Sequence, residues 1–192
     1  MKTSLLVVDD FLPNPELVRR RALRSDFQEC EFQGAKYKGV GGSNQPEDIH
    51  HRISRVFGRT VCMSLMFYRT GTPGNEPTTY IHADRNCAEM AGVLYLNTPD
   101  QCRGGTAFWK HKRSGCDSIK DMILSQKFTD FDELNRDGND EANWEMTGLV
   151  PMKFNRFVCY PTDVFHSRYP KEGWGADLEN GRLIWVCFFN LR

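Results

Sequence analysis

The sequence lacks the features that would place it in a membrane or on a nucleic acid. Its N-terminal apolar run, Leu5–Val8, has only four residues, which is too short for a signal peptide or a membrane span. Lys plus Arg and Asp plus Glu balance at 25 each, and this balance argues against a broad nucleic-acid or anionic-membrane surface. We therefore expect a cytoplasmic protein without a membrane or nucleic-acid partner.

The cysteines also exclude common scaffolds. There are seven, an odd number, and no two are spaced as Cys-X-X-Cys. This pattern argues against a disulfide framework and against a zinc cage, and it fits a reducing compartment. The sequence has no internal repeat and no low-complexity tract, so solenoids and disordered linkers are excluded as well.

The length of 192 residues suggests one domain spanning 1–192. Residues 1–60 are expected to form an N-terminal helical support: Asn14 and Pro15 suit a helix start, and a second helix is expected over 47–57. Gly34–Gln45 is rich in glycine and polar residues and is expected to be a loop. Charged and polar residues dominate from about 110 to 148, which predicts a helical or loop insertion within the domain.

Most of the expected strands follow residue 60. They are short, apolar and rich in β-branched and aromatic residues, and turn residues separate them. The expected strands are Leu5–Val8, Val61–Arg69, Ala91–Asn97, Ala107–Trp109, Asn155–Tyr160 and Arg182–Phe189. Strand clusters of this kind predict a mainly β fold with flanking helices, arranged as a sandwich or barrel.

A histidine and an aspartate two residues apart, His82 and Asp84, are the first candidate for a functional site. Side chains two apart on an extended strand point to the same face. An imidazole and a carboxylate on one face bind a divalent metal if a third ligand joins them. The alternative is a loop with two exposed polar residues.

Two further residues strengthen the metal interpretation. His166 follows a strand and a turn and is the candidate third ligand, because two histidines and one carboxylate form the facial triad typical of non-haem Fe(II). Arg182 enters a buried strand and needs an anionic partner. That partner is either a bound carboxylate or an Asp or Glu of the protein. Arg168 is a competing candidate for a bound carboxylate.

The motifs together resemble a known family. In chain order they read His82-X-Asp84, Tyr95-Leu96-Asn97, Gly104-Gly105-Thr106, His166 and Gly181-Arg182. This order resembles the Fe(II)/2-oxoglutarate-dependent dioxygenases, most closely their prolyl-4-hydroxylase-like branch, over about residues 62–190. The opening stretch Val8–Pro15 also resembles small phage or bacterial oxygenase-like proteins of unassigned role.

The resemblance implies a double-stranded β-helix (a jelly-roll, cupin-like) in which the three candidate metal ligands bind Fe(II). It implies that Arg182 holds the distal carboxylate of 2-oxoglutarate, that the Tyr95 hydroxyl donates to the same group, and that Tyr68 lines the pocket. O2 would be the second cosubstrate, ascorbate would support activity, and succinate and CO2 would be released. Family members that halogenate have a small residue in place of the carboxylate, so Asp84 favours hydroxylation or a related oxidation.

Two other functions stay open from the sequence. One is a non-catalytic jelly-roll module with a vestigial metal site, and the other is a metal-dependent cupin-like hydrolase or isomerase. The substrate class also stays open among a peptide side chain, an amino acid and a small metabolite. The segments expected to decide it are Gly34–Gln45, Thr70–Thr79 and the insertion of about 110–148.

Overall fold

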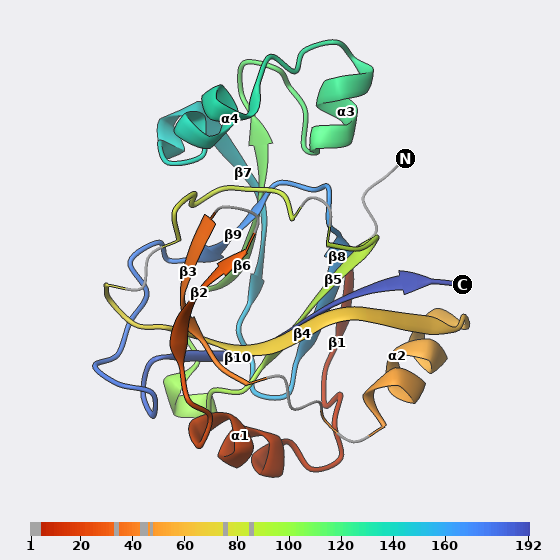
Figure 1. Cartoon of the computed structure of the whole chain (residues 1–192), viewed down its shortest axis with the longest axis vertical. Coiled ribbons are helices and arrows are strands. Elements are labelled where there is room, and N and C mark those ends of the chain that lie inside the picture. The colour runs from red at the N-terminus through yellow and green to blue at the C-terminus, as the bar shows by residue number, and fades with distance from the viewer. Residues whose placement is uncertain (1–4, 33–34, 43–45, 47, 75–76, 85–86) are drawn as a thin grey trace.

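The structure is a computed structural model that describes residues 5–32, 35–42, 46, 48–74, 77–84 and 87–192. Within these residues strands predominate, so the expectation of a mainly β chain is confirmed (Figure 1). The elements, in order, are β1 (Leu6–Val8), α1 (Pro15–Leu23), β2 (Gln28–Phe32), β3 (Ala35–Val40), α2 (Ile49–Phe57), β4 (Val61–Gly71), β5 (Met90–Tyr95), η1 (Pro99–Gln101), β6 (Gly105–His111), α3 (Ile119–Leu124), α4 (Phe131–Asp137), η2 (Glu141–Asn143), β7 (Trp144–Pro151), β8 (Phe157–Pro161), β9 (His166–Tyr169) and β10 (Arg182–Leu191).

The strands form two antiparallel sheets. The larger has the order β1-β8-β5-β10-β4-β3-β2, and the smaller has the order β7-β6-β9. The helices α1 and α2 lie on one side of the large sheet, whereas the small sheet lies on the other (Figure 1). None of the helices in the described part of the chain is long and apolar enough to cross a membrane.

The central strands of the large sheet are buried on both faces, as the near-continuous apolar sequence of β10 predicts. On the helix side, Tyr68, Leu94 and Trp185 pack in one cluster with Ile49 and Ile53 of α2. On the other side, alternate residues of the same strands pack towards the small sheet; among them are Val93, Ile184, Val186 and Phe188. A strand alternates its side chains between faces, so each strand serves both clusters.

The segment between β6 and β7 carries α3 and α4, whose first turns are capped by the side chains of Ser118 and Asp130. It docks on the chain that leads to His82: Ile81 N donates to Gly138 O at 2.8 Å, and Tyr80 N donates to Asn139 Oδ1 at 2.9 Å. The strands reach further into this region than expected, to His111 and from Trp144, because β6 and β7 pair along their whole length.

Two sequence expectations need correction. The segment Gly34–Gln45 is not only a loop, because β3 occupies Ala35–Val40; positions 34 and 43–45 lie outside the described residues. Nor is 1–60 only a helical support, because β1, β2 and β3 belong to the large sheet. The short alternation of polar and apolar residues in β2 and β3 gave no clear strand pattern, and pairing with each other and with β4 stabilises them instead.

Candidate metal centre

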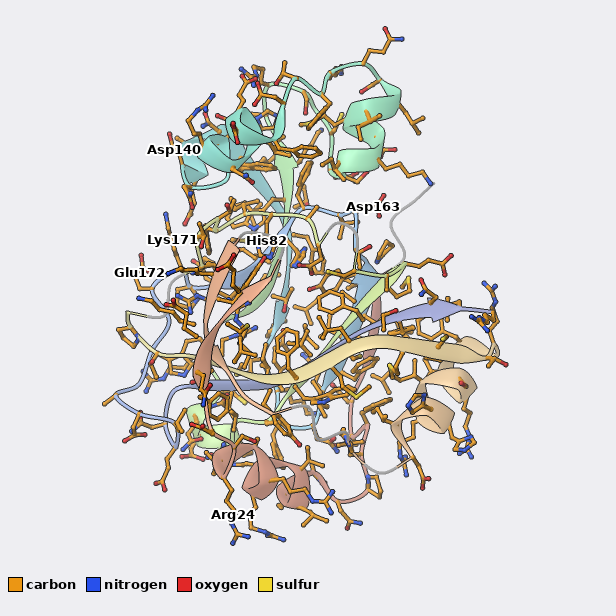
Figure 2. The ribbon with its side chains drawn as sticks, viewed as in Figure 1. Arg24, His82, Asp140, Asp163, Lys171 and Glu172 are labelled. Carbon is orange, nitrogen blue, oxygen red and sulfur yellow. The ribbon has the colours of Figure 1, made fainter. Side chains whose placement is uncertain are left out.

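The structure brings His82, Asp84 and His166 together. His82 and His166 lie directly opposite each other in an isolated antiparallel bridge, with His82 N to His166 O at 3.0 Å and His166 N to His82 O at 2.9 Å. Asp84 N donates to Thr162 O at 2.8 Å, which ties the carboxylate segment to the turn before β9. His82 lies near the middle of the molecule, between the insertion that carries Asp140 and the end of α1 at Arg24 (Figure 2).

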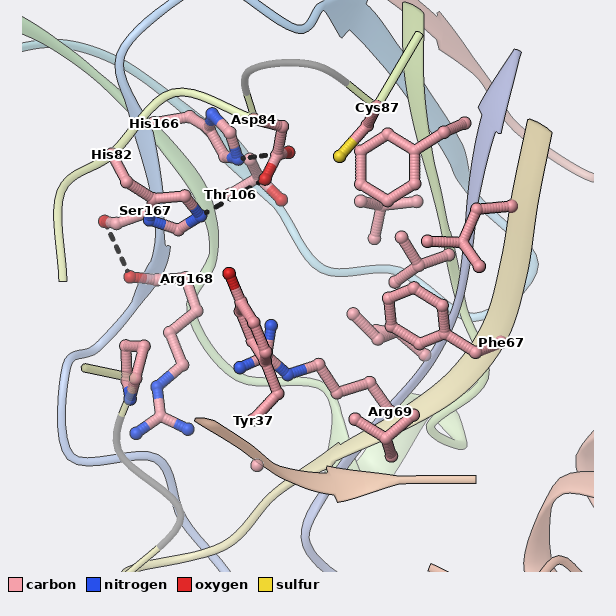
Figure 3. A pocket seen from close by; sticks show the side chains of 18 of the residues that line it. Tyr37, Phe67, Arg69, His82, Asp84, Cys87, Thr106, His166, Ser167 and Arg168 are labelled. Carbon is pink, nitrogen blue, oxygen red and sulfur yellow. Dashed lines mark hydrogen bonds and ion pairs between the residues drawn. The ribbon is translucent and has the colours of Figure 1, made fainter. Parts of the chain in front are cut away.

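The three side chains converge on one point. Asp84 Oδ2 is 3.2 Å from His166 Nε2, and Asp84 Oδ1 is 3.6 Å from His82 Nε2 (Figure 3). One ligand atom from each residue lies within 4.8 Å of the other two. Such spacing lets a single small cation contact all three.

Backbone carbonyls orient both imidazoles. His82 Nδ1 lies 3.0 Å from Tyr80 O, and His166 Nδ1 lies 3.1 Å from Val164 O. A carbonyl only accepts, so each Nδ1 carries a proton and each Nε2 is directed at Asp84, where the lone pair of the neutral ring can bind a cation. Metal-bound histidines are typically fixed in this way through their second nitrogen.

The charges of the cluster also suit a cation. Burial lowers the pKa of His82 to about 4, and the neighbouring His166 lowers it further, so His82 is neutral at neutral pH. Burial alone would raise the pKa of Asp84, but His166 outweighs this effect by its charge and its hydrogen bond, and the pKa of Asp84 is lowered. Neutral imidazole and ionised carboxylate are the forms that ligate, so few protons need displacing.

The donor set fits a catalytic ion better than a structural one. Two imidazoles and one carboxylate leave coordination positions open, and this is the set typical of non-haem Fe(II). Structural zinc sites are closed and usually contain thiolates. No cysteine belongs to this group of ligand atoms in the described part of the chain.

The cluster faces a cavity of about 280 Å³ between the two sheets. One wall is apolar and comes from β4, β5 and β10; its residues are Leu65, Phe67, Val93, Ile184, Val186 and Phe188. The opposite side carries the metal-ligand cluster and Thr106 (Figure 3). Tyr160 of β8 also lines the cavity, with its ring centre 4.7 Å from that of His166. The cavity therefore offers an apolar surface next to a candidate cation site, which is the usual character of a small-molecule site.

Arg182 lines this cavity and is only 5% exposed. Its Nε has no hydrogen-bond partner, and no ion pair joins it to a carboxylate of the described residues. Burial lowers its pKa to about 10, opposed by nearby Tyr95 and reinforced by the positive charges of Arg168 and Arg69. A buried guanidinium without an anion is costly, so the geometry points to a bound anion rather than to a salt bridge within the protein.

Tyr95 lies beside Arg182, with the guanidinium carbon 6.0 Å from the centre of the Tyr95 ring. Its buried hydroxyl is 2.7 Å from Thr106 Oγ1. Thr106 lines the cavity, whereas Tyr95 lies behind it in the apolar cluster between the sheets. A ligand held by Arg182 would therefore meet Thr106 first, with Tyr95 orienting that hydroxyl.

The expectation for Tyr68 is wrong. Tyr68 is fully buried on the helix side of β4, in the cluster with Trp185 and Leu94. Its neighbours Phe67 and Arg69 face the cavity instead. Because side chains alternate along a strand, Tyr68 cannot line the same cavity as the residues on either side of it.

Arg168, the competing arginine, also lines the cavity, but its Nε donates to Lys171 O at 2.9 Å. Sequence reasoning missed two other residues there, Arg69 and Tyr37. The apolar alternation of β4 contained a signal for Arg69, because it shares the Phe67 face. Tyr37 had no such sequence signal, because it lies in the glycine-rich polar segment that was expected to be a loop.

Comparison with known families gives a match along nearly the whole chain. Residues 1–189 match a family described as a family of unknown function, DUF6445. No curated protein matches the chain.

Comparison with solved structures identifies the fold. The non-haem α-ketoglutarate-dependent carbocyclase SnoK from nogalamycin biosynthesis matches with a TM-score of 0.58 at 14% identity, over 98% of this chain and 79% of that one. The α-ketoglutarate-dependent epimerase SnoN from the same biosynthesis gives 0.57 at 13%, over 98% and 78%. AviO1 from Streptomyces viridochromogenes Tue57 gives 0.52 at 13%, over 97% and 89%. At these identities the likeness shows a shared fold alone.

Proposed function

Because the chain belongs to DUF6445, a family of unknown function, its activity must be argued from its site, and we propose that it is an Fe(II)- and 2-oxoglutarate-dependent oxygenase. The observation that carries the proposal is the meeting of two features in one cavity: the His82, Asp84 and His166 cluster and the unpaired, buried Arg182. The first suits Fe(II), and the second suits a carboxylate.

Each residue has a defined role in this proposal. His82, Asp84 and His166 hold the ion on one side and leave its remaining positions open to the cavity. Arg182 binds the distal carboxylate of 2-oxoglutarate in the apolar depth of the site, where Thr106 supplies a hydroxyl that Tyr95 orients. When bound, iron and 2-oxoglutarate supply the activation of O2 that oxidises a substrate C–H bond, with release of succinate and CO2.

The fold comparison supports this proposal without fixing the reaction. We take the two facing antiparallel sheets as a double-stranded β-helix and keep the prolyl-4-hydroxylase-like branch as part of the proposal. Two of the fold neighbours are described as a carbocyclase and an epimerase. Hydroxylation of a peptide side chain, amino acid or small metabolite is our first choice because Asp84 supplies a carboxylate ligand, and ring closure or epimerisation are the alternatives that these neighbours suggest.

The test is succinate formation from 2-oxoglutarate with Fe(II), O2 and ascorbate, in the presence of a substrate library. We expect turnover in the wild type and none in His82→Ala or Asp84→Ala. Arg182→Met should mainly raise the KM for 2-oxoglutarate, since it removes a charge-assisted contact to the cosubstrate. Metal-independent turnover in His82→Ala would refute the proposal. A folded wild type that binds neither Fe(II) nor 2-oxoglutarate would indicate a non-catalytic module.

A further inference from the structure

Arg69 is a third arginine that lines the cavity, besides Arg182 and Arg168, and the proposed cosubstrate does not need it. It lies on β4, opposite Ile184 of β10, while Arg182 lies opposite Gly71. The two guanidinium groups therefore come from neighbouring strands, but from positions two residues apart. No hydrogen bond or ion pair joins Arg69 to a carboxylate of the described residues, and its half-buried place in the cavity wall lowers its pKa, opposed by the charge of Asp84.

Tyr37 covers Arg69. The Arg69 guanidinium carbon is 5.7 Å from the centre of the Tyr37 ring, which is within the range of a cation–π contact. Tyr37 comes from β3, which the pairing of Val40 with Arg69 holds against β4. In Figure 3 the hydroxyl end of Tyr37 points towards His82 and Asp84, and the Arg69 side chain passes behind the ring. A phenol and a guanidinium thus offer donors in the same part of the cavity.

The charges that line the cavity leave room for another anion. Among the described residues they are three arginines, Arg69, Arg168 and Arg182, against two carboxylates, Asp84 and Glu31. A divalent ion and the two carboxylates of 2-oxoglutarate cancel each other. One positive charge therefore remains, and a carboxylic acid at neutral pH carries one negative charge, whereas a phosphate monoester carries nearly two. Arg168 donates Nε to Lys171 O, which orients it without cancelling its charge, and Arg69 is the arginine that shares the apolar face of β4 with Leu65 and Phe67.

The surroundings of Arg69 define the rest of the ligand. Leu65 and Phe67 precede it on the same face of β4, and Val186 and Phe188 of β10 lie beside them in the cavity wall. Figure 3 shows Arg69 and Phe67 next to each other on this wall. A ligand whose carboxylate meets Arg69 would therefore lay an apolar body along the wall, across from the metal-ligand cluster.

We propose that Arg69 and Tyr37 bind the carboxylate of the substrate, and that the substrate is an organic acid with an apolar body. This inference rests on the proposed function and adds its substrate class. The planar guanidinium donates two parallel hydrogen bonds to a carboxylate, and Tyr37 contributes a third donor while its ring holds the guanidinium plane. Arg69 and Tyr37 thus select and position the substrate, while the metal-ligand cluster performs the chemistry.

The experiment uses the full chain with Zn(II) and N-oxalylglycine, a stable mimic of 2-oxoglutarate. The probes are hexanoate, octanoate and 4-phenylbutanoate, each paired with its primary amide, and binding is followed by ligand-observed NMR. We expect at least one acid to bind the wild type about 10–100-fold more tightly than its amide, as a charge-assisted contact would give. Arg69→Met should abolish this preference, Tyr37→Phe should weaken it and Arg69→Lys should keep part of it.

The affinity for N-oxalylglycine separates the two proposals and serves as the folding control. We expect Arg69→Met to bind it as the wild type does, and Arg182→Met to bind it more weakly. If no acid is preferred over its amide in a wild type that binds N-oxalylglycine, the substrate class is wrong and the proposed function stands. If the acid preference survives Arg69→Met, or if Arg69→Met loses N-oxalylglycine, the role of Arg69 is wrong. If the wild type fails to bind N-oxalylglycine, the proposed function fails.

Discussion

Two histidine–carboxylate clusters in this protein use the same chemical groups differently. His82, Asp84 and His166 face a cavity, and a backbone carbonyl orients each imidazole through Nδ1, so that each Nε2 faces Asp84. His111 is 2% exposed, and both of its ring nitrogens are hydrogen-bonded. Nδ1 lies 3.0 Å from Ser114 Oγ, and Nε2 lies 3.1 Å from Asp137 Oδ2. In the first cluster the ligand atoms meet at one point where an ion can bind, whereas in the second both nitrogens of His111 are bound to partners within the protein.

The partners of Asp137 close the second cluster completely. Asn143 Nδ2 donates to Asp137 Oδ1 at 3.3 Å, Arg113 contributes a longer contact at 3.4 Å, and Trp144 Nε1 donates to the Asp137 carbonyl at 2.8 Å. These bonds fasten α4 and the insertion to the end of β6 and the start of β7. A histidine beside an aspartate is therefore a site only where hydrogen bonds leave its second nitrogen open, and elsewhere it stabilises the fold.

The largest expected difference between the clusters is in metal binding. Asp84→Ala should weaken Mn(II) binding by more than about 100-fold, because it removes a ligand. Losing only the hydrogen-bond partner of a ligand typically costs about 10–100-fold in metal affinity. Asp137→Ala, the matched change in the closed cluster, should leave the affinity unchanged. Isothermal titration of both folded variants measures this. Equal losses in the two variants would mean that the cavity cluster is not the ion site.

The second expected difference is in stability without ligands. His111→Ala should cost about 3 kcal/mol, because it removes the two hydrogen bonds to Ser114 and Asp137 and opens a cavity. For a chain of this size such a loss corresponds to a fall in Tm of about 6–12 °C. Arg182→Met should be neutral or stabilising, because it removes an unpaired buried charge. Calorimetry of the two metal-free variants measures these changes in Tm. An equal fall in Tm in His111→Ala and Arg182→Met would show that Arg182 has a partner within the protein.

The smallest expected difference is in pH dependence. His82 has a pKa of about 4 in the folded protein against an ordinary value of 6.5. As the pH falls below 6.5, His82 takes up a proton in the unfolded state, but in the folded state it does so only near pH 4. The free energy of unfolding is therefore highest above about pH 6.5 and decreases as the pH falls below it. The decrease is about 2 kcal/mol between pH 7 and pH 5. Urea unfolding at several pH values should show this slope in metal-free protein.

The control for this prediction is another histidine. His82→Gln should flatten the slope, whereas His51→Gln, an exposed change on α2, should not. A slope that persists in His82→Gln would assign the titration to a different group.

Much of the site was predictable from local sequence, and the rest depended on contacts far apart in the chain. The His82 and Asp84 spacing, the position of His166 after a strand and the entry of Arg182 into an apolar strand each carried a local signal. Which face of β4 meets the cavity had no local signal, because it depends on how β4 packs beside β10, and Tyr68 was therefore assigned to the wrong face. Tyr37 and the bonds of His111 depend on pairing with distant segments, which no local periodicity encodes.

The most direct test of the central claim is the visible absorption of the wild type with Fe(II) and 2-oxoglutarate under anaerobic conditions. If the cavity holds both, the chelate should give a charge-transfer band that saturates at one equivalent of iron per chain. The band should be absent in Asp84→Ala, unchanged in Asp137→Ala, and reached only at higher 2-oxoglutarate in Arg182→Met. A folded wild type without the band, or a band that persists in Asp84→Ala, would contradict the assignment of His82, Asp84 and His166 as the iron site.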